Sequence, residues 1–498
     1  MLILLLLPTT GFAALLYFTV SYYRNVSRHP KGPFPLPFIG NLKEFNFLRQ
    51  HDSLEMWARD WKGVYTVFIP TPSVVLNTYE AMREAFVEKG DDFAGRPTME
   101  ILKAFMYAYN SGVIMSNGDV WREQRRTALS ILRDFGMGKS TMEENVKSSI
   151  QQFLDHVETF EDKERVELHW QIQVVIANII NEVLFDFRYV YSDCQPLMEY
   201  VDNLAKMTAG MANAPLFVLV GSVPILKKVP FLADFAMGEH QRAMEKLRQF
   251  IDDQVERSLR NFHPDLDEPQ CFTQAYMQRA LTNDDLSLHQ LRAICFDFFL
   301  AGQETTTTTM RWTTLILAAH QDVQDKVRAE VLEVVGRDRL PSMQDKTKMP
   351  YAQACLHELQ RFANILTVNV AHETVNDTEV QGHFIKKGTT VINDLHGILK
   401  NDPVFGGDGD KFRPERYLAE DGKTLKKELI ERTVAFSIGK RACAGEGLAR
   451  MELFLGLTSI VQKYQLLPSP DGPVDLSENC MIEVVMPVEQ NLTLLHVD

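Results

Sequence analysis

The segment from Leu286 to His320 constrains the fold most, because its helical pattern is nearly apolar in the middle. A helix at a protein surface keeps a polar face, whereas a helix that is apolar all round must be covered by other elements. A second helical pattern runs from His240 to Leu259. Its apolar positions recur at helical spacing and share one face: Met244, Leu247, Ile251 and Val255. The sequence therefore predicts a core built mainly of helices.

Strand patterns are fewer. Residues 64–69 and 73–76 flank a Pro-Thr-Pro turn and predict a β-hairpin, and residues 379–392 predict a second one. We find no internal repeat and no low-complexity tract in the 498 residues. Apolar residues make up 45% of the chain and charged residues 24%, which is ordinary for a globular protein. We expect one large, mainly α domain with a small β region.

The N-terminus has the composition of a membrane anchor. Residues 2–23 carry no charged side chain, and a helix of this length spans about 33 Å, enough for a hydrocarbon core of ~30 Å. Arg24, Arg28 and Lys31 follow, so the positive-inside rule places the rest of the chain in the cytosol. A cleaved signal peptide is the alternative, but no basic residue precedes the apolar run and the run is long for such a peptide.

Two further segments are rich in proline. Residues 24–41 are first basic and then proline-rich, which predicts a stiff, extended linker. We therefore expect an anchor over residues 1–23, this linker, and a domain over residues 42–498. Residues 216–232 contain two prolines and a glycine and predict a loop, yet they are strongly apolar. Such a loop is either buried or dips into a membrane surface.

Charge and cysteine content exclude other classes of function. The formal net charge is -14, so general binding of nucleic acid is not expected. The six cysteines lie far apart and form no CxxC pair, which argues against a zinc ribbon and against a disulfide framework. A reducing compartment fits this pattern best.

The most informative cysteine lies in residues 436–446, which read Phe-Ser-Ile-Gly-Lys-Arg-Ala-Cys-Ala-Gly-Glu. Taken alone, Cys443 would be an inert buried thiol. Gly439 and Gly445 bracket it, so the backbone can turn sharply and a flat group can approach closely. An amphipathic helix expected over residues 447–457 places the thiol at a helix N-terminus, which lowers a thiol pKa. A single thiolate suits an iron that a porphyrin already holds.

Four motifs resemble those of the cytochromes P-450. Phe436-x-x-Gly439-x-Arg441-x-Cys443-x-Gly445 looks like the haem-binding loop of that family. The other three occur in the family's order: Ala301-Gly302-Gln303-Glu304-Thr305-Thr306, Glu358-x-x-Arg361, and Phe412-Arg413-Pro414-Glu415-Arg416-Tyr417. The anchor and the linker are similar to those of the microsomal class, nearest the animal drug-metabolising family. The resemblance covers essentially the whole chain and implies a single large haem domain behind a transmembrane helix.

The resemblance also implies a role for each motif. Cys443 would be the axial ligand of the haem iron. Glu304 and Thr305 would relay protons in a notch opened by small residues, although close helix packing is the other interpretation of those residues. Glu358, Arg361 and Arg416 would form a structural network, because a buried Glu–Arg pair needs a third partner. The residues implied to bind haem b are Arg96, Trp121, Arg125, Ala301, His372, Phe436, Arg441 and Gly445.

The implied activity is that of a haem-thiolate monooxygenase, which inserts one atom of O2 into a lipophilic fatty acid, steroid or xenobiotic. The chain has no Gly-rich flavin or nicotinamide fingerprint. Electrons from NADPH would therefore come through a separate NADPH–cytochrome reductase, with a small cytochrome as a further donor. Arg122, Arg126 and Lys440 would form an outward basic face for an acidic donor, with Arg125 turned inward. The implied location is the endoplasmic reticulum membrane, with a single span and a cytosolic catalytic domain in contact with membrane lipid.

Three alternatives remain to be weighed. A rearranging enzyme or carrier with haem would not need Glu304 and Thr305. A serine hydrolase would use Ser437 in an approximate nucleophile elbow, with His496 and Asp471 or Asp475 in chain order, but its first glycine is replaced and Cys443 stays unexplained. A zinc peptidase fails, because Arg361 stands where the second histidine of its motif is required.

Overall fold

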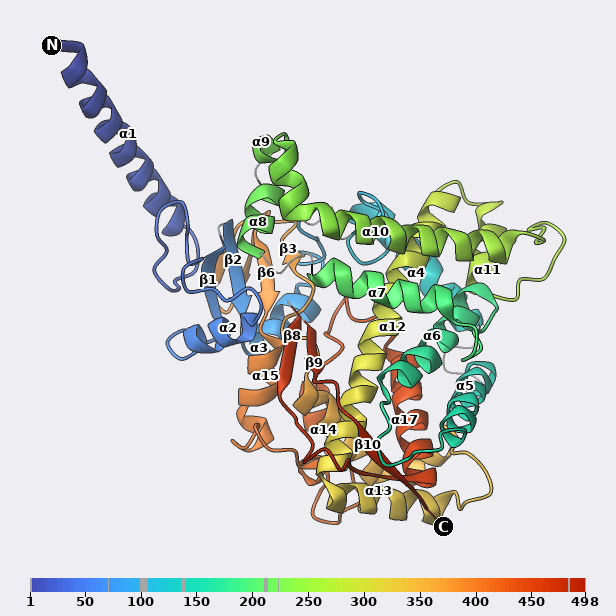
Figure 1. Ribbon diagram of the computed structural model, residues 1–498. Helices are drawn as coiled ribbons and strands as arrows, with labels where there is room; N and C mark the ends of the chain where they lie inside the picture. The colour runs from blue at the N-terminus through green and yellow to red at the C-terminus, as the bar shows by residue number, and fades with distance from the viewer. Residues whose placement is uncertain are drawn as a thin grey trace. The chain divides into compact units, whose positions relative to one another are not determined.

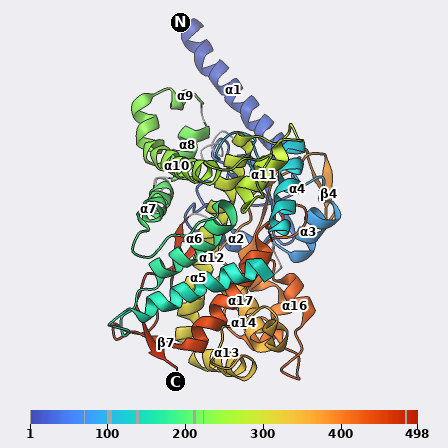
Figure 2. The same ribbon diagram turned by 90° about the vertical axis from the view of Figure 1, so that its right-hand side faces the viewer.

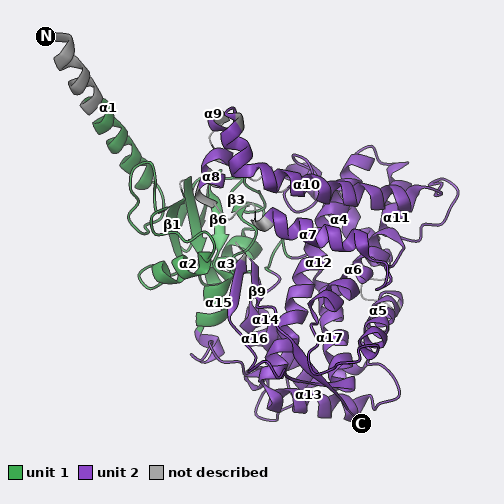
Figure 3. Cartoon of the chain, in the orientation of Figure 1, with its two compact units in different colours: residues 1–97, 366–402, 437–442 green, residues 98–365, 403–436, 443–498 purple. Residues whose placement is uncertain are grey.

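The chain folds into two units (Figure 3). The computed structural model describes residues 2–69, 71–98, 106–135, 140–209, 214–222, 224–481 and 484–497. Unit 1 comprises residues 1–97, 366–402 and 437–442, and unit 2 comprises residues 98–365, 403–436 and 443–498.

Unit 1 is built on a four-stranded sheet with the strand order β1-β2-β6-β3. β1 (Val64–Ile69) and β2 (Thr71–Leu76) are antiparallel, which confirms the first predicted hairpin. β6 (Thr390–Asn393) pairs in parallel with β2 and antiparallel with β3 (His372–Glu373). The sheet packs against the amphipathic helix α2, where Leu54, Trp57, Tyr65, Val67, Val75 and Val368 form the core of this unit. Its helices are α1 (Leu2–Val26), α2 (Gln50–Ala58), α3 (Tyr79–Arg83), the π-helix η1 (Glu84–Glu88) and α15 (Leu395–Asn401).

The second predicted hairpin is only partly correct. β4 (Thr378–Val380) and β5 (His383–Ile385) do form an antiparallel pair. The C-terminal part of the predicted hairpin, β6, joins the larger sheet instead, because Val391 is fully buried there between β2 and β3. Local alternation predicts a strand, but it does not select the partner strand.

The proline-rich segment is docked on unit 1. A Cβ on Gly32 would lie 2.0 Å from the Thr66 carbonyl oxygen, and the Phe68 amide donates to the Asn41 side chain at 2.9 Å. The segment is therefore a strap along β1. The predicted anchor lies in α1, where residues 1–12 have side chains outside the described residues. A search confined to the described residues finds no helix that is both long and apolar enough to span a bilayer.

Unit 2 contains most of the described helices. They are α4 (Gly118–Asp134), α5 (Ser140–Glu158), α6 (His169–Phe185), α7 (Gln195–Ala209), α8 (Ala214–Ser222), α9 (Pro224–Lys227), α10 (Pro230–Leu259), α11 (Phe272–Ala280), α12 (Leu288–Ala319), α13 (Gln321–Val334), α14 (Pro350–Ala363), α16 (Lys427–Arg432) and α17 (Glu446–Lys463). Short 3-10 turns are η3 (Asp345–Lys348), η4 (Pro403–Phe405) and η5 (Pro414–Tyr417). Two antiparallel pairs join β7 (Tyr464–Pro468) to β10 (Leu492–His496) and β8 (Glu478–Met481) to β9 (Val484–Pro487).

α12 is the central helix of unit 2 (Figure 1), as the apolar pattern predicts. It begins after Ser287, whose hydroxyl accepts from the Gln290 amide at 3.2 Å. It packs against α6, α14 and α17, while α5 crosses α6 and α17 (Figure 2). The predicted helix over 240–259 is confirmed within α10, which packs along α7 (Figure 1) and buries Met244, Leu247, Ile251 and Val255.

Two expectations for unit 2 are wrong. Residues 216–232 are largely helical rather than a loop, because Pro224 and Pro230 each stand at the start of a helix, where proline is tolerated. Phe217 and Val220 are buried within this segment, whereas Ile225 and Phe231 are 71% and 83% exposed. The helix after Cys443 extends to Lys463, and it is not amphipathic, because it is buried from Met451 to Gln462.

Candidate functional site

The loop before α17 positions Cys443. The Cys443 amide donates to the Phe436 carbonyl at 3.0 Å, which closes the loop within unit 2. Gly439 has φ +82°, and a Cβ there would lie 2.0 Å from the Phe86 carbonyl oxygen in unit 1, so only glycine fits. Gly445 has φ -94°, a value open to any residue, and it precedes the first residue of α17. The sharp turn therefore depends on Gly439 and not on Gly445.

The Cys443 thiol is exposed although protein surrounds it. Burial raises the pKa of this thiol. The amides of Gly445 and Glu446 and the guanidinium of Arg125 act in the opposite direction and do not outweigh burial. The expectation of a lowered thiol pKa is therefore wrong for the chain alone, since desolvation exceeds the effect of the helix N-terminus. An accessible thiol that receives backbone N–H bonds nevertheless suits a metal, which deprotonates a coordinating thiol outright.

α4 supplies two of the residues predicted to bind haem. Trp121 is buried and Arg125 is partly buried one helical turn later. Burial lowers the pKa of Arg125, and the adjacent Cys443 raises it, so these two side chains are neighbours. Arg122 and Arg126 point outward, as expected, and each pairs with a carboxylate of its own helix. Lys440 in unit 1 pairs likewise with Asp91, so the predicted basic face is largely neutralised in the free chain.

Unit 1 contains two arginines and a histidine of the predicted set. Arg96 donates to the carbonyls of residues 370 and 371 at 2.7 and 2.9 Å, and Arg441 donates to that of Ala94 at 2.9 Å. His372 contacts the Phe93 carbonyl through Nδ1 at 2.7 Å and stacks on Phe86. Burial holds the pKa of His372 well below its usual range, and Arg96 and Arg441 lower it further. His372 is therefore neutral, and the two guanidinium groups of Arg96 and Arg441 are the cations here that suit an anion such as a haem propionate.

The acid and the alcohol predicted to relay protons lie on α12. From Ala293 to Ala318 the helix is buried, except for six partly exposed residues between 298 and 305, which include Ala301, Glu304 and Thr305. The Thr305 hydroxyl donates to the Ala301 carbonyl at 2.7 Å. Thr309 and Thr313 repeat this bond one and two turns later, which explains how the helix tolerates its threonines.

Close helix packing, the other interpretation of the small residues, applies to part of α12. A Cβ on Gly302 would lie 2.7 Å from the Ile180 side chain of α6, so this glycine allows the two helices to approach. The packing interpretation therefore applies to Gly302, while the partial exposure of Ala301 and Thr305 leaves room beside them.

Phe436, at the start of the cysteine loop, faces the Arg450 guanidinium of α17 at 4.9 Å from its ring centroid.

Unit 2 brings Glu358, Arg361 and Arg416 together. Glu358 is fully buried, and its two oxygens accept from Arg361 at 2.7 and 2.9 Å. Arg416 donates to the same carboxylate at 2.9 Å, and so does the Arg413 amide at 2.8 Å. Arg416 is therefore the third partner that the buried pair of Glu358 and Arg361 requires.

Sequence reasoning missed a fourth member of this network. Asp408 accepts from Arg416 at 2.7 Å. The network of Glu358, Arg361, Arg416 and Asp408 therefore contains two positive and two negative charges. Arg416, followed by Arg413, holds the pKa of Asp408 well below its usual range. Asp408 lies among glycines in an irregular segment, where no periodicity marks it.

Gln173 and His169 of α6 were also missed, and both approach the predicted proton relay. Gln173 donates to the Glu304 carboxyl at 3.4 Å and contacts the His169 ring at 3.3 Å.

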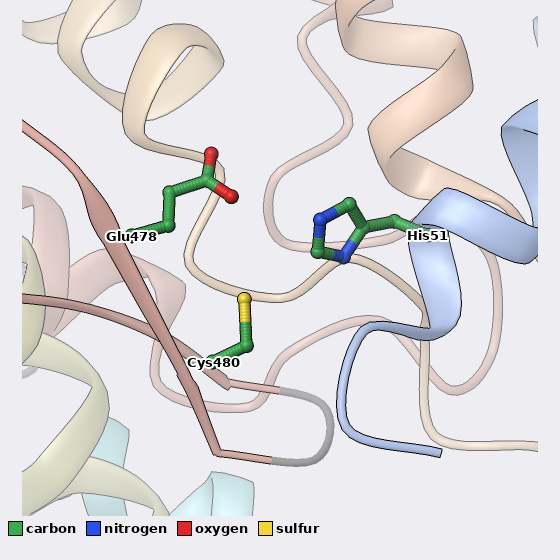
Figure 4. A group of neighbouring side chains, drawn as sticks. All are labelled: His51, Glu478 and Cys480. Atoms are coloured by element: carbon green, nitrogen blue, oxygen red, sulfur yellow. The ribbon is translucent and has the colours of Figure 1, made fainter. Parts of the chain in front are cut away.

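Figure 4 shows another group of polar side chains, His51 of α2 with Glu478 and Cys480 of β8. His51 belongs to unit 1 and the other two to unit 2, so we assign no metal site to them.

Comparison with known proteins identifies the family. The cytochrome P450 family model matches residues 30–495. Cytochrome P450 2J2 from Homo sapiens is 32% identical over 480 residues, which cover 94% of this chain and 91% of that protein. Cytochrome P450 2B19 from Mus musculus is 34% identical over 490 residues, which cover 96% and 95% of the two chains. Cytochrome P450 2C70 from Mus musculus is 33% identical over 446 residues, 88% of each chain.

The chain belongs to the cytochrome P450 family, within the animal drug-metabolising class. It is an oxidoreductase, a haem-thiolate monooxygenase. The family implies a haem cofactor, and the accessible Cys443 thiol and the guanidinium groups of Arg96, Arg125 and Arg441 fit such a group. The hydrolase and zinc-peptidase alternatives have no support from this membership.

Proposed function

We propose that the protein oxygenates a lipophilic small molecule, such as a fatty acid, a steroid or a xenobiotic, with electrons from a separate NADPH–cytochrome reductase. The main supporting observation is the partly exposed stretch of α12, which contains Glu304 and Thr305, while the rest of the helix from Ala293 to Ala318 is buried. Dioxygen activation needs such a pair, whereas a carrier or a rearranging enzyme does not. The absence of a dinucleotide fingerprint in the sequence supports an external electron donor. A small cytochrome is a second candidate donor.

Within a domain over residues 42–498, we assign the following roles to individual residues. Cys443 holds the iron, and Trp121 and Arg125 bind the propionates of haem b. Haem, when bound, supplies the iron at which dioxygen is activated. Glu304 and Thr305 hold and move the protons, and the network around Glu358 stabilises the fold. The remaining cofactor contacts are Arg96, Ala301, His372, Phe436, Arg441 and Gly445.

We expect Thr305→Ala to separate electron consumption from product formation. Without the hydroxyl, proton delivery falters, and electrons leave as hydrogen peroxide. General acid–base groups contribute 10²–10⁴-fold, so we expect product per NADPH to fall by about tenfold or more. NADPH oxidation, peroxide and product are measured with purified reductase. Thr309→Ala is the matched control, because it removes the same hydroxyl-to-carbonyl bond from a buried turn. Unchanged coupling in Thr305→Ala would exclude the relay role.

We further propose that the protein is a single-pass protein of the endoplasmic reticulum membrane, anchored by residues 1–23, with its catalytic domain in the cytosol. A second contact with lipid would be the apolar surface of α8–α10, defined by Leu219, Ile225, Val229, Phe231 and Phe235, all exposed. Lys228 is exposed beside it and suits lipid headgroups. The similarity of the N-terminal segment and the linker to those of the microsomal class supports this location.

We expect the chain without residues 1–23 to bind phosphatidylcholine vesicles through the α8–α10 surface. Phe231→Ser with Phe235→Ser should weaken that binding by about tenfold or more, since burial of one Phe side chain contributes about 1.5–3 kcal/mol. Leu266→Ser is the control, because Leu266 is equally exposed but lies outside this surface. Vesicle flotation measures the bound fraction. Equal binding of the double variant and the control would contradict the assignment of this surface.

A further inference from the structure

A chain of hydrogen bonds leads from the surface of unit 2 to Glu304. The side chain of Glu489, which is 70% exposed, accepts from Nδ1 of His169 at 3.0 Å. Nε2 of His169 lies 3.3 Å from the amide nitrogen of Gln173, and that nitrogen donates to Glu304 at 3.4 Å. His169 is the first residue of α6 and Gln173 lies one turn later, so both side chains project from the same face.

The orientation of the Gln173 amide is fixed by its neighbours. Its oxygen accepts from the Gln303 side chain and from the Thr307 hydroxyl, the latter at 3.4 Å. Its nitrogen therefore faces Glu304 and His169. Gln173, Gln303 and Thr307 are all buried, so a reversed amide would leave buried groups without matching partners.

This orientation also fixes the tautomer of neutral His169. Nε2 must accept from the Gln173 amide, so the ring proton resides on Nδ1 and is donated to Glu489. Among the described side chains, the Thr308 hydroxyl is the other group that donates to Glu304, at 3.4 Å. Gln173 thus supplies one of two bonds that direct this carboxyl group.

We propose that Gln173 is a positioning residue, which directs the Glu304 carboxyl group for proton delivery to Thr305, and that His169 holds Gln173 in place. The inference rests on the proposed oxygenation and adds to it two residues that lie outside the four motifs described above. Neither residue touches the reacting atoms. Each acts through the orientation of Glu304.

The charge of His169 controls this arrangement. The charged groups that face its ring are Glu167 on the preceding segment, Glu489 after β9, and Glu304 and Arg311 of α12. Burial, and then Arg311, lower the pKa of His169, and the three carboxylates oppose them without reversing the direction. His169 is therefore neutral at pH 7. A proton added to Nε2 turns this acceptor into a donor, so protonation below pH 6.5 releases the Gln173 amide.

The first experiment compares Gln173→Leu with Gln171→Leu, the same change on the same helix. Gln171 is the matched control, because its side-chain oxygen has no hydrogen-bond partner among the residues that the structure describes. We expect peroxide per NADPH to rise about five- to tenfold in Gln173→Leu, since small misplacements of catalytic groups have effects of this order. Gln171→Leu should stay within about 1.5-fold of the unaltered enzyme. An equal effect of the two changes would overturn the proposal.

A second pair of variants separates positioning from packing. His169→Asn keeps an acceptor for the Gln173 amide, so coupling should stay near that of the unaltered enzyme and lose its decline below pH 6.5. His169→Phe fills the same space without an acceptor, so peroxide should rise at every pH. Retention of the pH-dependent decline by His169→Asn would overturn the role of His169.

A third readout needs no turnover. The imidazole of His169 is titrated by NMR in the resting protein, and its signal is assigned by its loss in His169→Asn. We expect a pKa below 6.5, a lower value in Glu489→Gln, and a higher value in Gln173→Leu, which removes a donor to the neutral ring. An unchanged value in Gln173→Leu would contradict the proposed contact. Failure of the unaltered enzyme to form product would instead refute the proposed oxygenation and leave this titration valid.

Discussion

Glu358→Gln is expected to leave little folded protein. Glu358 is fully buried and binds two guanidinium groups, Arg361 and Arg416, which are 2% and 3% exposed. The amide keeps the size of the side chain but removes the negative charge that both buried cations contact, and Asp408 contacts Arg416. Breaking a buried ion pair on one side costs about 3–5 kcal/mol. That is a large part of a total stability of about 5–15 kcal/mol.

The measurement is the yield of soluble protein at a low expression temperature, followed by thermal unfolding of what is recovered. Asp202→Asn is the control, because it breaks an exposed i, i+4 pair with Lys206 on α7. Exposed pairs contribute about 0–1 kcal/mol, so this variant should behave like the unaltered protein. If Glu358→Gln unfolded at the same temperature as the control, the network would not have the stabilising role assigned to it.

The network stabilises an irregular part of unit 2. Arg361 of α14 donates to the carbonyls of residues 409 and 411 at 2.7 and 3.0 Å. Arg416 donates to the Lys411 carbonyl at 2.9 Å. Backbone carbonyl groups between η4 and η5 thus accept hydrogen bonds from buried guanidinium groups rather than within regular secondary structure. Loss of the central carboxylate would affect this whole segment.

The long helices could be predicted because their signal is local. α12 and α10 repeat apolar residues at helical spacing, and all four residues predicted for the apolar face of α10 are buried. The partners of β6 could not be predicted, because pairing joins segments far apart in sequence. Residues 216–232 were mistaken for a loop because proline breaks a helix in its interior but is accepted at its start.

The candidate site likewise contains residues that could be predicted from the sequence and residues that could not. The residues around Cys443 could be found because they form one contiguous motif. Gln173 and Asp408 reach the site only through tertiary contacts, with Glu304 and with Arg416 respectively. The thiol pKa was predicted with the wrong direction, since the sequence shows the helix N-terminus but not the desolvation of the side chain.

The assignment of Cys443 as iron ligand has the largest expected effect on function. Cys443→Ala removes the sulfur, while the loop that carries it keeps its bond from the residue 443 amide to the Phe436 carbonyl. The chain should therefore still fold, but haem would be retained poorly or bound without a thiolate. Cys480→Ala is the control, because this partly exposed cysteine lies on β8, outside the motif.

The reduced carbon-monoxide spectrum of the purified protein tests this assignment most directly. We expect the strongly red-shifted band of a thiolate-ligated haem in the unaltered protein and in Cys480→Ala, and its complete loss in Cys443→Ala. A red-shifted band that persisted in Cys443→Ala, or an unaltered protein whose iron carried imidazole or water in place of sulfur, would contradict it.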